Sequence, residues 1–236
     1  MYGSKRSVVS VVIPAAGKGS RMGMEQNKQY VEVLGKPILA RTVQSFEDCS
    51  LVDEIIIATG EEEVEYCERM IVERYGFRKV KAVIAGGASR QQSVYKGLQQ
   101  VRDDCGIVLI HDGARPFIGV DSIAACISAA EENGAACAAV PVKDTIKRAD
   151  TEGFVKKTVD RRSLWSIQTP QAFQYGLIVE AHHKAAVEGF DGTDDAVLAE
   201  RLGHKVRLVM CSYYNIKITT KEDLAIAEAI SRIICD

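Results

Sequence analysis

The sequence lacks any apolar run of the ~18 residues that a membrane-spanning helix needs. Its seven cysteines are scattered and include no C-x-x-C pair, which argues against a disulfide framework and against a structural zinc site. The formal net charge of −2 gives no overall basic field of the kind that non-specific nucleic-acid binders carry. We therefore expect a cytoplasmic protein with no nucleic-acid or membrane partner, in which a local group of cations holds any bound anion.

Short apolar runs typical of buried strands alternate along the chain with runs of helical periodicity. Strands are predicted at residues 8–13, 54–58, 80–85, 107–111 and 136–142. Helices are predicted at residues 38–46, 62–75, 91–101 and 120–133. This alternation predicts an α/β fold with a doubly wound, mostly parallel sheet. Ligands of such sheets bind outside the carboxyl ends of the strands.

The organisation of the chain changes after Val142. Residues 143–164 alternate apolar with charged side chains around a Thr151-Glu152-Gly153 turn, which predicts a protruding two-stranded β-arm that is too small to be stable alone. Two helical runs, a short strand and a terminal helix are predicted after it, at 174–188, 193–202, 206–210 and from residue 221. We expect residues 1–236 to form a single domain from which the β-arm projects.

The loop after the first predicted strand matches neither of the two common phosphate-binding motifs. A Walker A sequence is missing, and Gly17 to Gly23 reads G-x-G-x-x-x-G, so no nicotinamide site is expected. The small residues still let backbone N–H groups approach a polyphosphate, and Arg21 and Lys28 add positive charge nearby. The alternative is a tight turn with solvated cations, but the two cations favour a phosphate site.

Two further strand ends carry candidate site residues. The stretch from Gly86 to Ser93 offers bare backbone to a base edge or a phosphate, although it could also be an ordinary helix cap. Asp112 and Arg115 follow the fourth predicted strand. A single carboxylate there suits Mg²⁺, which fills its octahedron with phosphate oxygens and water. A salt bridge between Asp112 and Arg115 explains the pair equally well, so both interpretations stay open.

Seven segments taken together resemble a known family. They are PAAGKGSRMG with NKQY and GKPIL, GGASRQQSVYKGL, HDGARPF, VPVKDTIK, TVDRRSLWSIQTPQAF, GTDDA and NIKITT. They occur in the order seen in the 2-C-methyl-D-erythritol 4-phosphate cytidylyltransferases of non-mevalonate isoprenoid biosynthesis, whose fold is that of the nucleotide-diphospho-sugar transferases. The sister family, ribitol 5-phosphate cytidylyltransferase, is similar in most of these segments. One departure is Asn27, which stands where the family usually has proline.

The resemblance implies a role for each matching residue. The catalytic residues would be Arg21, Lys28, Arg161 and Lys217. The residues that bind CTP would be Ala15, Ala16, Gly17, Gly19, Gly87, Ser93, Asp112 and Arg115, with Asp112 also serving Mg²⁺. The residues that bind the phosphorylated polyol would include Thr145, Thr169 and Thr193. In the family the arm crosses to the partner subunit, so a homodimer is expected.

Charge considerations favour a mechanism without a general base. The second pKa of a phosphate monoester is about 6, so the attacking oxygen is already largely deprotonated at neutral pH. The four histidines form no cluster in the sequence, and we interpret them as caps, packing residues or surface residues. Three hypotheses remain: cytidylyl transfer to methylerythritol phosphate, the same transfer to ribitol phosphate, and a non-catalytic nucleotide-binding regulator.

Overall fold

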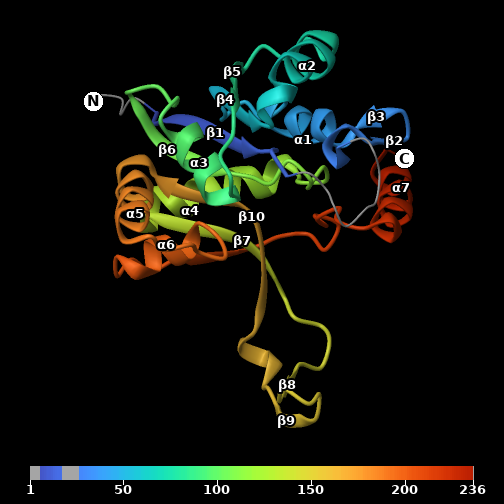
Figure 1. Cartoon of the computed structure of the whole chain (residues 1–236), viewed down its shortest axis with the longest axis vertical. Helices are drawn as coiled ribbons and strands as arrows, with labels where there is room; N and C mark the ends of the chain where they lie inside the picture. Colours follow the sequence, from blue (N-terminus) through green and yellow to red (C-terminus); the bar gives the residue numbers. More distant parts are fainter. Residues whose placement is uncertain (1–5, 18–26, 236) are drawn as a thin grey trace.

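A seven-stranded sheet lies at the centre of the computed structural model, which describes residues 6–17 and 27–235 (Figure 1). Its strand order is β11 (Arg207–Met210), β7 (Ala135–Pro141), β10 (Trp165–Gln174), β6 (Cys105–Ile110), β1 (Val8–Pro14), β4 (Glu54–Thr59) and β5 (Val80–Ala85). Only β10 runs antiparallel to its neighbours in this sheet. The predicted doubly wound, mostly parallel sheet is therefore confirmed, and the five strands predicted before the arm are present with ends shifted by no more than two residues.

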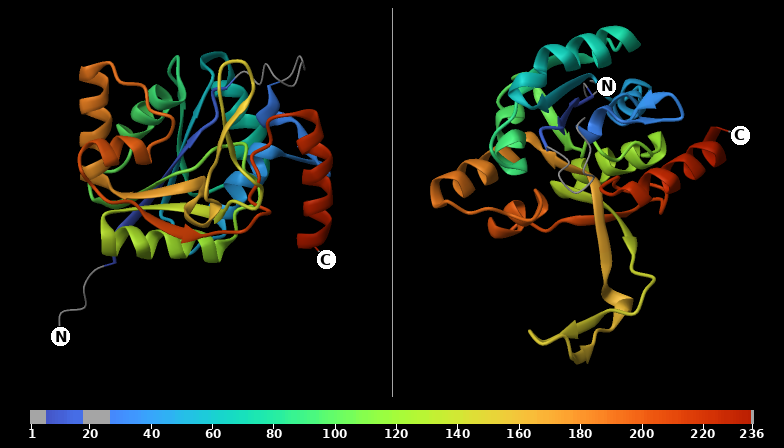
Figure 2. Two further views of the ribbon diagram at one scale, coloured as in Figure 1. Left: turned by 90° about the horizontal axis from the view of Figure 1, so that it is seen from below. Right: turned by 45° about the vertical axis from the view of Figure 1, so that its right-hand side comes forward.

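Helices cover both faces of this sheet (Figure 2). One face packs against α1 (Ile38–Glu47) and α4 (Val120–Asn133), and the other against α3 (Arg90–Leu98), α5 (Tyr175–Glu188) and α6 (Ala196–Arg201). The alternation of side chains along a strand explains how β1 serves both faces. Val11 and Ile13 pack on the α1 side, whereas Val12 packs on the α3 side. The apolar residues on both sides of β1 thus follow from burial on both faces, and its polar residue, Ser10, is buried with its hydroxyl donating to Glu54 Oε1 at 2.6 Å.

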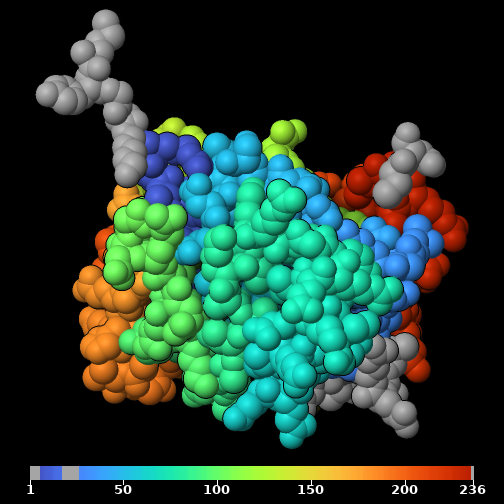
Figure 3. Space-filling model, turned by 90° about the horizontal axis from the view of Figure 1, so that it is seen from above, coloured from blue at the N-terminus to red at the C-terminus, as the bar shows by residue number. Residues whose placement is uncertain are grey.

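The predicted helix at 62–75 is irregular in the structure. The 3₁₀ turn η3 (Glu61–Glu63) leads into the short helix α2 (Val64–Cys67), and π-helical turns follow in η4 (Glu68–Glu73). Cys67 and Ile71 point into the core, while most of the segment is exposed. Figure 3 shows this teal segment over much of the face seen from above. The prediction of helical structure in this segment was correct, but its division into a 3₁₀ turn, a short α-helix and π-helical turns was not predicted.

Strand β10 was absent from the prediction. Its residues include Pro170 and several polar side chains, so they show no apolar run. The buried polar side chains of β10 instead form hydrogen bonds: the Gln171 side chain accepts from the amides of Asp195 and Ala196 at 3.0 and 2.9 Å. Specific polar contacts with a distant segment stabilise this strand, and such contacts cannot be read from local periodicity.

The predicted β-arm is a hairpin that projects away from the sheet (Figures 1 and 2). It consists of β8 (Lys147–Ala149), β9 (Val155–Thr158) and the 3₁₀ turn η5 (Arg161–Ser163). Gly153 takes a φ of +90° in the connecting turn, a value that favours glycine. Phe154 and Val155 are 68% and 62% exposed, so the arm leaves apolar side chains uncovered in one chain.

The C-terminal helix α7 (Lys221–Cys235) packs beside a small hairpin, β2 (Glu32–Val33) and β3 (Lys36–Pro37). Ile218 and Ile230 contribute to a separate apolar cluster with Val33 there. The loop that precedes α7 carries Lys217, and it is joined to the loop after β6 by a 2.9 Å hydrogen bond from the amide of Ile218 to the carbonyl of Ala114. Among the described helices, none combines the length and the apolar character needed to cross a membrane.

Candidate functional site

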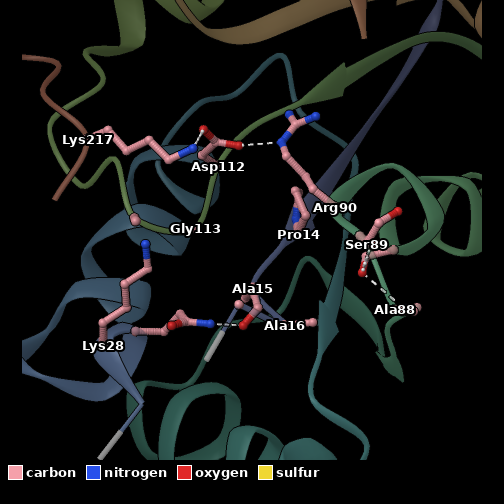
Figure 4. Close-up of a pocket in the computed structure, with 15 residues that line it drawn as sticks. Pro14, Ala15, Ala16, Lys28, Ala88, Ser89, Arg90, Asp112, Gly113 and Lys217 are labelled. Atoms are coloured by element: carbon pink, nitrogen blue, oxygen red, sulfur yellow. Dashed lines mark hydrogen bonds and ion pairs between the residues drawn. The ribbon is translucent and has the colours of Figure 1, made fainter. Parts of the chain in front are cut away.

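A cavity of about 290 Å³ lies at the carboxyl ends of β1, β5 and β6 (Figure 4). Its lining comes from residues 14–17, 28–29, 87–90 with 93, 112–114 and 217. Eight of the predicted site residues line it: Ala15, Ala16, Gly17, Lys28, Gly87, Ser93, Asp112 and Lys217. The structure thus brings together segments that are far apart in the sequence, at the edge where a parallel sheet binds ligands.

The first loop enters the cavity directly from β1. The amide of Ala15 donates to the carbonyl of Ala58 at 2.7 Å, and the Gln29 side chain donates to the carbonyl of Ala15. Lys28 belongs to the 3₁₀ turn η2 (Lys28–Tyr30), and Figure 4 shows its side chain extending into the cavity. The predicted residues Gly19 and Arg21 lie outside the described residues.

The second loop connects β5 to α3. Ser89 is the N-cap of α3, with its hydroxyl accepting from the amide of Gln92 at 3.2 Å. The Ser93 hydroxyl accepts from the amide of Gly87 at 3.0 Å and donates to the carbonyl of Ser89 at 2.9 Å. A Cβ at Gly87 would lie 2.4 Å from the Cβ of Gln92. The loop is therefore both a helix cap and a lining of the cavity, and Ser93 holds the backbone of Gly87 in place.

Asp112 is the centre of a cluster of three cations. Its Oδ1 accepts from Arg90 Nε at 2.8 Å, and its Oδ2 lies 2.7 Å from Lys217 Nζ and 3.8 Å from Arg115 Nε. Burial alone would raise the pKa of Asp112, but Arg90 and Lys217 outweigh burial and lower it. The salt bridge with Arg115 is thus present, but it is the longest of the three contacts. Asp112 is a carboxylate that fixes two cations at the cavity wall.

Arg90 was missed by the sequence interpretation. It lines the cavity as the first residue of α3, and it donates to Asp195 at 2.7 Å as well as to Asp112. Asp195 also accepts from His182 at 3.1 Å. Burial alone would lower the pKa of Arg90, but Asp195 and Asp112 raise it. The signal was available, because Arg90 is a cation beside bare backbone, the criterion that selected Arg21.

Two buried polar residues, Thr169 and His111, lie next to Asp112 on the side away from the cavity. The Thr169 hydroxyl accepts from the amide of Asp112 at 3.0 Å and lies 3.1 Å from His111 Nδ1. Burial lowers the pKa of His111 to about 4, so its ring is neutral at pH 7. Its Nε2–H then donates to the carbonyl of Arg115 at 3.0 Å, and its Nδ1 accepts from Thr169. His111 is a packing residue, as expected, and Thr169 lies behind the cavity wall.

Besides Thr169, four more predicted residues that the structure describes lie outside the cavity lining. Arg115 has a side chain that is 12% exposed and donates to the carbonyl of Asn215 at 2.8 Å. Thr193 is exposed on the turn before α6. Thr145 and Arg161 are exposed in the β-arm, where Arg161 donates to the carbonyl of Lys143. The arm points away from the sheet in Figure 1, and neither residue lines the cavity of its own chain.

The cavity offers little to a metal ion on its own. Within the described part of the chain, no group of three or more histidine, cysteine, aspartate or glutamate side chains could hold one. Among the described residues that line the cavity, Asp112 is the one with an acidic side chain. A divalent cation would therefore need most of its ligands from another molecule.

Comparisons with known proteins agree over nearly the whole chain. Residues 9–232 match the family model of 2-C-methyl-D-erythritol 4-phosphate cytidylyltransferase. A relative of that name from Alkaliphilus oremlandii is 52% identical over 95% of both chains. Another from Caldanaerobacter subterraneus is 50% identical over 95% of this chain and 99% of its own.

Solved structures give the same result. The 4-diphosphocytidyl-2C-methyl-D-erythritol synthase of Anaerococcus prevotii has a TM-score of 0.85 and 34% identity, covering 96% of each chain. A 2-C-methyl-D-erythritol 4-phosphate cytidylyltransferase from Thermus thermophilus has a TM-score of 0.78 and 33% identity, covering 95% of this chain and 99% of the other. The fold and the sequence are thus similar to those of one and the same group of proteins.

Proposed function

The chain belongs to the 2-C-methyl-D-erythritol 4-phosphate cytidylyltransferase family, and on that premise we propose how its cavity carries out the family's reaction. The enzyme joins CTP to 2-C-methyl-D-erythritol 4-phosphate, giving 4-diphosphocytidyl-2-C-methyl-D-erythritol and pyrophosphate in isoprenoid biosynthesis. The observation that carries the mechanism is the convergence of Lys28 and the Asp112–Lys217 ion pair on one cavity at the carboxyl ends of the strands.

The triphosphate of CTP binds against residues 15–17, with Lys28 on the reacting phosphates. Bare backbone lets the phosphate oxygens approach closely, and Lys28 supplies fixed charge at their side. The cytosine and ribose lie along the loop of Gly87, which Ser93 holds in shape. Arg21 and Gly19 complete this part of the site in our proposal, on the basis of the family resemblance.

The reaction is a displacement at the α-phosphorus of CTP. A phosphate oxygen of the polyol substrate forms the new bond to phosphorus, and the bond to the β-phosphate oxygen breaks as pyrophosphate leaves. The attacking oxygen needs no base, since its pKa is about 6. His111 could not serve as one, because it is fully buried and both ring nitrogens are engaged. Lys28 and Lys217 instead reduce repulsion between the two anions and stabilise the charge that develops.

Members of this family use a divalent cation, and we propose Mg²⁺ with Asp112 as its protein ligand. A carboxylate has about four acceptor positions, and Arg90 and Lys217 occupy two in the structure. The remaining positions fit an ion that takes its other ligands from phosphate and water. When bound, Mg²⁺ would neutralise phosphate charge. Asp112 itself orients Lys217 and Arg90 at the wall of the cavity.

We further propose that the phosphorylated polyol meets residues of two chains. Thr145 and Arg161 lie on the arm, outside their own cavity, and the arm exposes apolar side chains that a partner would cover. A homodimer that exchanges arms accounts for both features. In this arrangement residues 1–236 form one nucleotidyltransferase domain with 143–164 as its excursion, and Thr193 contacts the polyol from the rim. Thr169 and Arg115 support Asp112 from behind.

A cytoplasmic location also belongs to this proposal. The six described cysteines that are free are all buried, which suits a reducing compartment. Both substrates carry phosphate groups, consistent with the local cations of the cavity.

The proposal is tested by measuring pyrophosphate release from CTP with each polyol phosphate in turn. Turnover is expected with methylerythritol phosphate and Mg²⁺, and none when the polyol phosphate is omitted. Turnover with ribitol phosphate alone would place the chain's activity in the sister family. Binding of CTP without turnover on either substrate would overturn the catalytic assignment and favour a regulator.

A further inference from the structure

The turn that carries Lys28 is tied to the sheet on both sides of this residue. Asn27 Nδ2 donates to Glu63 Oε1 at 2.8 Å. Gln29 donates to the carbonyl of Ala15, and the Tyr30 hydroxyl lies 3.0 Å from Thr59 Oγ1. Gln29 and Tyr30 are both buried. Asn27 therefore anchors the backbone on the N-terminal side of Lys28.

Glu63 collects several of these contacts at one carboxylate. Besides Asn27, it accepts from Thr59 Oγ1 at 3.1 Å and from the amide of Gly60 at 3.3 Å. Thr59 ends β4 and Glu63 ends the turn η3 that follows, so the carboxylate is fixed to the edge of the sheet. Glu63 does not line the cavity. It can reach the reaction only through the residues that it holds.

A single turn of this kind needs such an anchor. Residues Lys28–Tyr30 form one 3₁₀ turn, closed by a 3.0 Å hydrogen bond from the amide of Tyr30 to the carbonyl of Asn27. One turn fixes several dihedral angles for little hydrogen-bond energy, so it is not stable by itself. The backbone of Asn27 has φ −62° and ψ 132°, a conformation that proline also adopts. The hydrogen bond to Glu63 thus holds the φ angle of residue 27 at a value that a proline ring could fix instead.

We propose that Asn27 and Glu63 are positioning residues for Lys28 in cytidylyl transfer. The proposal rests on the proposed function of Lys28. The hydrogen bond between their side chains fixes the first residue of the turn and thereby the direction of the lysine. A charge that must meet a developing negative charge loses much of its effect when displaced by about 1 Å. The bond therefore contributes to kcat more than to binding of CTP.

The first test compares Asn27→Ala with Asn27→Pro. Asn27→Ala is expected to lower kcat roughly tenfold with little change in the KM for CTP, because one partly buried hydrogen bond is lost and the turn is released. Asn27→Pro is expected to restore most of this loss, since its ring fixes φ near the observed −62°. A proline variant as impaired as the alanine variant would overturn the proposal.

The second test asks whether the effect passes through Glu63 and Lys28. Glu63→Ala combined with Asn27→Ala should be no slower than the slower single variant, since both remove the same bond. Asn27→Ala should also add little to Lys28→Ala, because a missing lysine cannot be misplaced. If the fold-losses in kcat of the two single variants multiply in either double variant, Asn27 acts independently of Glu63 or Lys28, and the proposal would fail.

Controls separate this proposal from loss of fold and from failure of the proposed function. Glu62→Ala alters an exposed neighbour of Glu63 and should leave kcat unchanged. The thermal midpoint of each variant shows whether it is folded, and a folded Asn27→Ala with wild-type kcat would overturn the inference. Absence of turnover in the wild type would contradict the proposed function itself, so the two failures are distinct.

Discussion

The guanidinium of Arg90 lies 2.7 Å from the carboxylate of Asp195, whose side chain is only 1% exposed. The same guanidinium donates to Asp112 at 2.8 Å, where the carboxylate is 10% exposed. Two buried acids therefore depend on one arginine for part of their charge balance. Arg90 connects the wall of the cavity to the turn before α6, so it contributes to stability and to the shape of the site together.

Arg90→Met is expected to destabilise the protein by about 3 kcal/mol at pH 7, because it leaves a buried carboxylate without its cation. Urea unfolding of the variant and the wild type measures this difference. Arg201→Met serves as the control, since Arg201 pairs with Glu188 at the surface and should cost less than about 1 kcal/mol. Equal losses for the two variants would contradict the role given to Arg90.

The effect of Arg90→Met should depend on pH. Burial favours a higher pKa for Asp112 and Asp195, but their ion pairs lower both values in the folded protein. Such carboxylates contribute stability above their unfolded pKa, which is about 3.9, and this contribution is lost as the pH falls through the folded values. The difference between wild type and variant should therefore be largest near pH 7 and shrink towards pH 3. A difference that stays constant would be against this explanation.

Lys28→Ala is expected to lower kcat by ~10²-fold or more, while binding of CTP weakens less. The reason is that Lys28 faces charge that grows as pyrophosphate leaves. Steady-state kinetics at varied CTP concentration separate the two effects. Lys184→Ala, at an exposed position on α5, is the matched control. A change in the KM for CTP alone would make Lys28 a contact of the ground state.

His111 should make the protein less stable in mild acid. Burial lowers its pKa to about 4, whereas an unfolded histidine has a pKa near 6.5. Between these values the unfolded chain binds a proton that the folded chain does not. The free energy of unfolding should then fall by about 1.4 kcal/mol per pH unit as the pH decreases.

His111→Gln tests this dependence, because glutamine cannot take up the proton. The slope of unfolding free energy against pH should be smaller in this variant between pH 6 and pH 4. His183→Gln, which changes an exposed histidine, should keep the wild-type slope. Identical slopes for all three proteins would mean that His111 does not titrate as its burial implies.

The parts of the fold that could be predicted are those where local pattern and burial agree. Both faces of β1 and β4 are covered, so most of their residues are apolar, and both segments were recognised as strands. β10 is equally buried over residues 168–173, but three of these residues, Gln168, Thr169 and Gln171, are polar and form hydrogen bonds with residues far away in the chain. A one-dimensional pattern contains no record of such partners.

The candidate site divides in the same way. Asp112 and the loop of Gly17 follow predicted strands, so the topology alone placed them at one edge of the sheet. Lys217 was assigned by resemblance only, because nothing near it in the sequence points to Asp112. Arg90 and Asp195 form a contact between the starts of two helices, α3 and α6, and neither segment contains a sign of the other. Side-chain partners across the fold are what the sequence interpretation lacked.

The arm yields the last prediction, which concerns the source of Arg161. Lys28→Ala and Arg161→Ala are each expected to be nearly inactive, and the two are unfolded and refolded as a mixture. If Arg161 acts in the partner's cavity, each mixed dimer has one doubly altered site and one intact site. About half of randomly paired dimers are mixed, so activity should return to roughly a quarter of the wild-type value.

If Arg161 acted within its own chain, each site of a mixed dimer would keep one alteration and no activity would return. Each variant refolded alone is the control for recovery of fold and of dimers, which size-exclusion chromatography measures. The exposed position of Arg161 on an arm that points away from its own cavity favours return of activity. A mixture that pairs freely and stays inactive would contradict the shared site, although the family's reaction would still stand, because that rests on other observations.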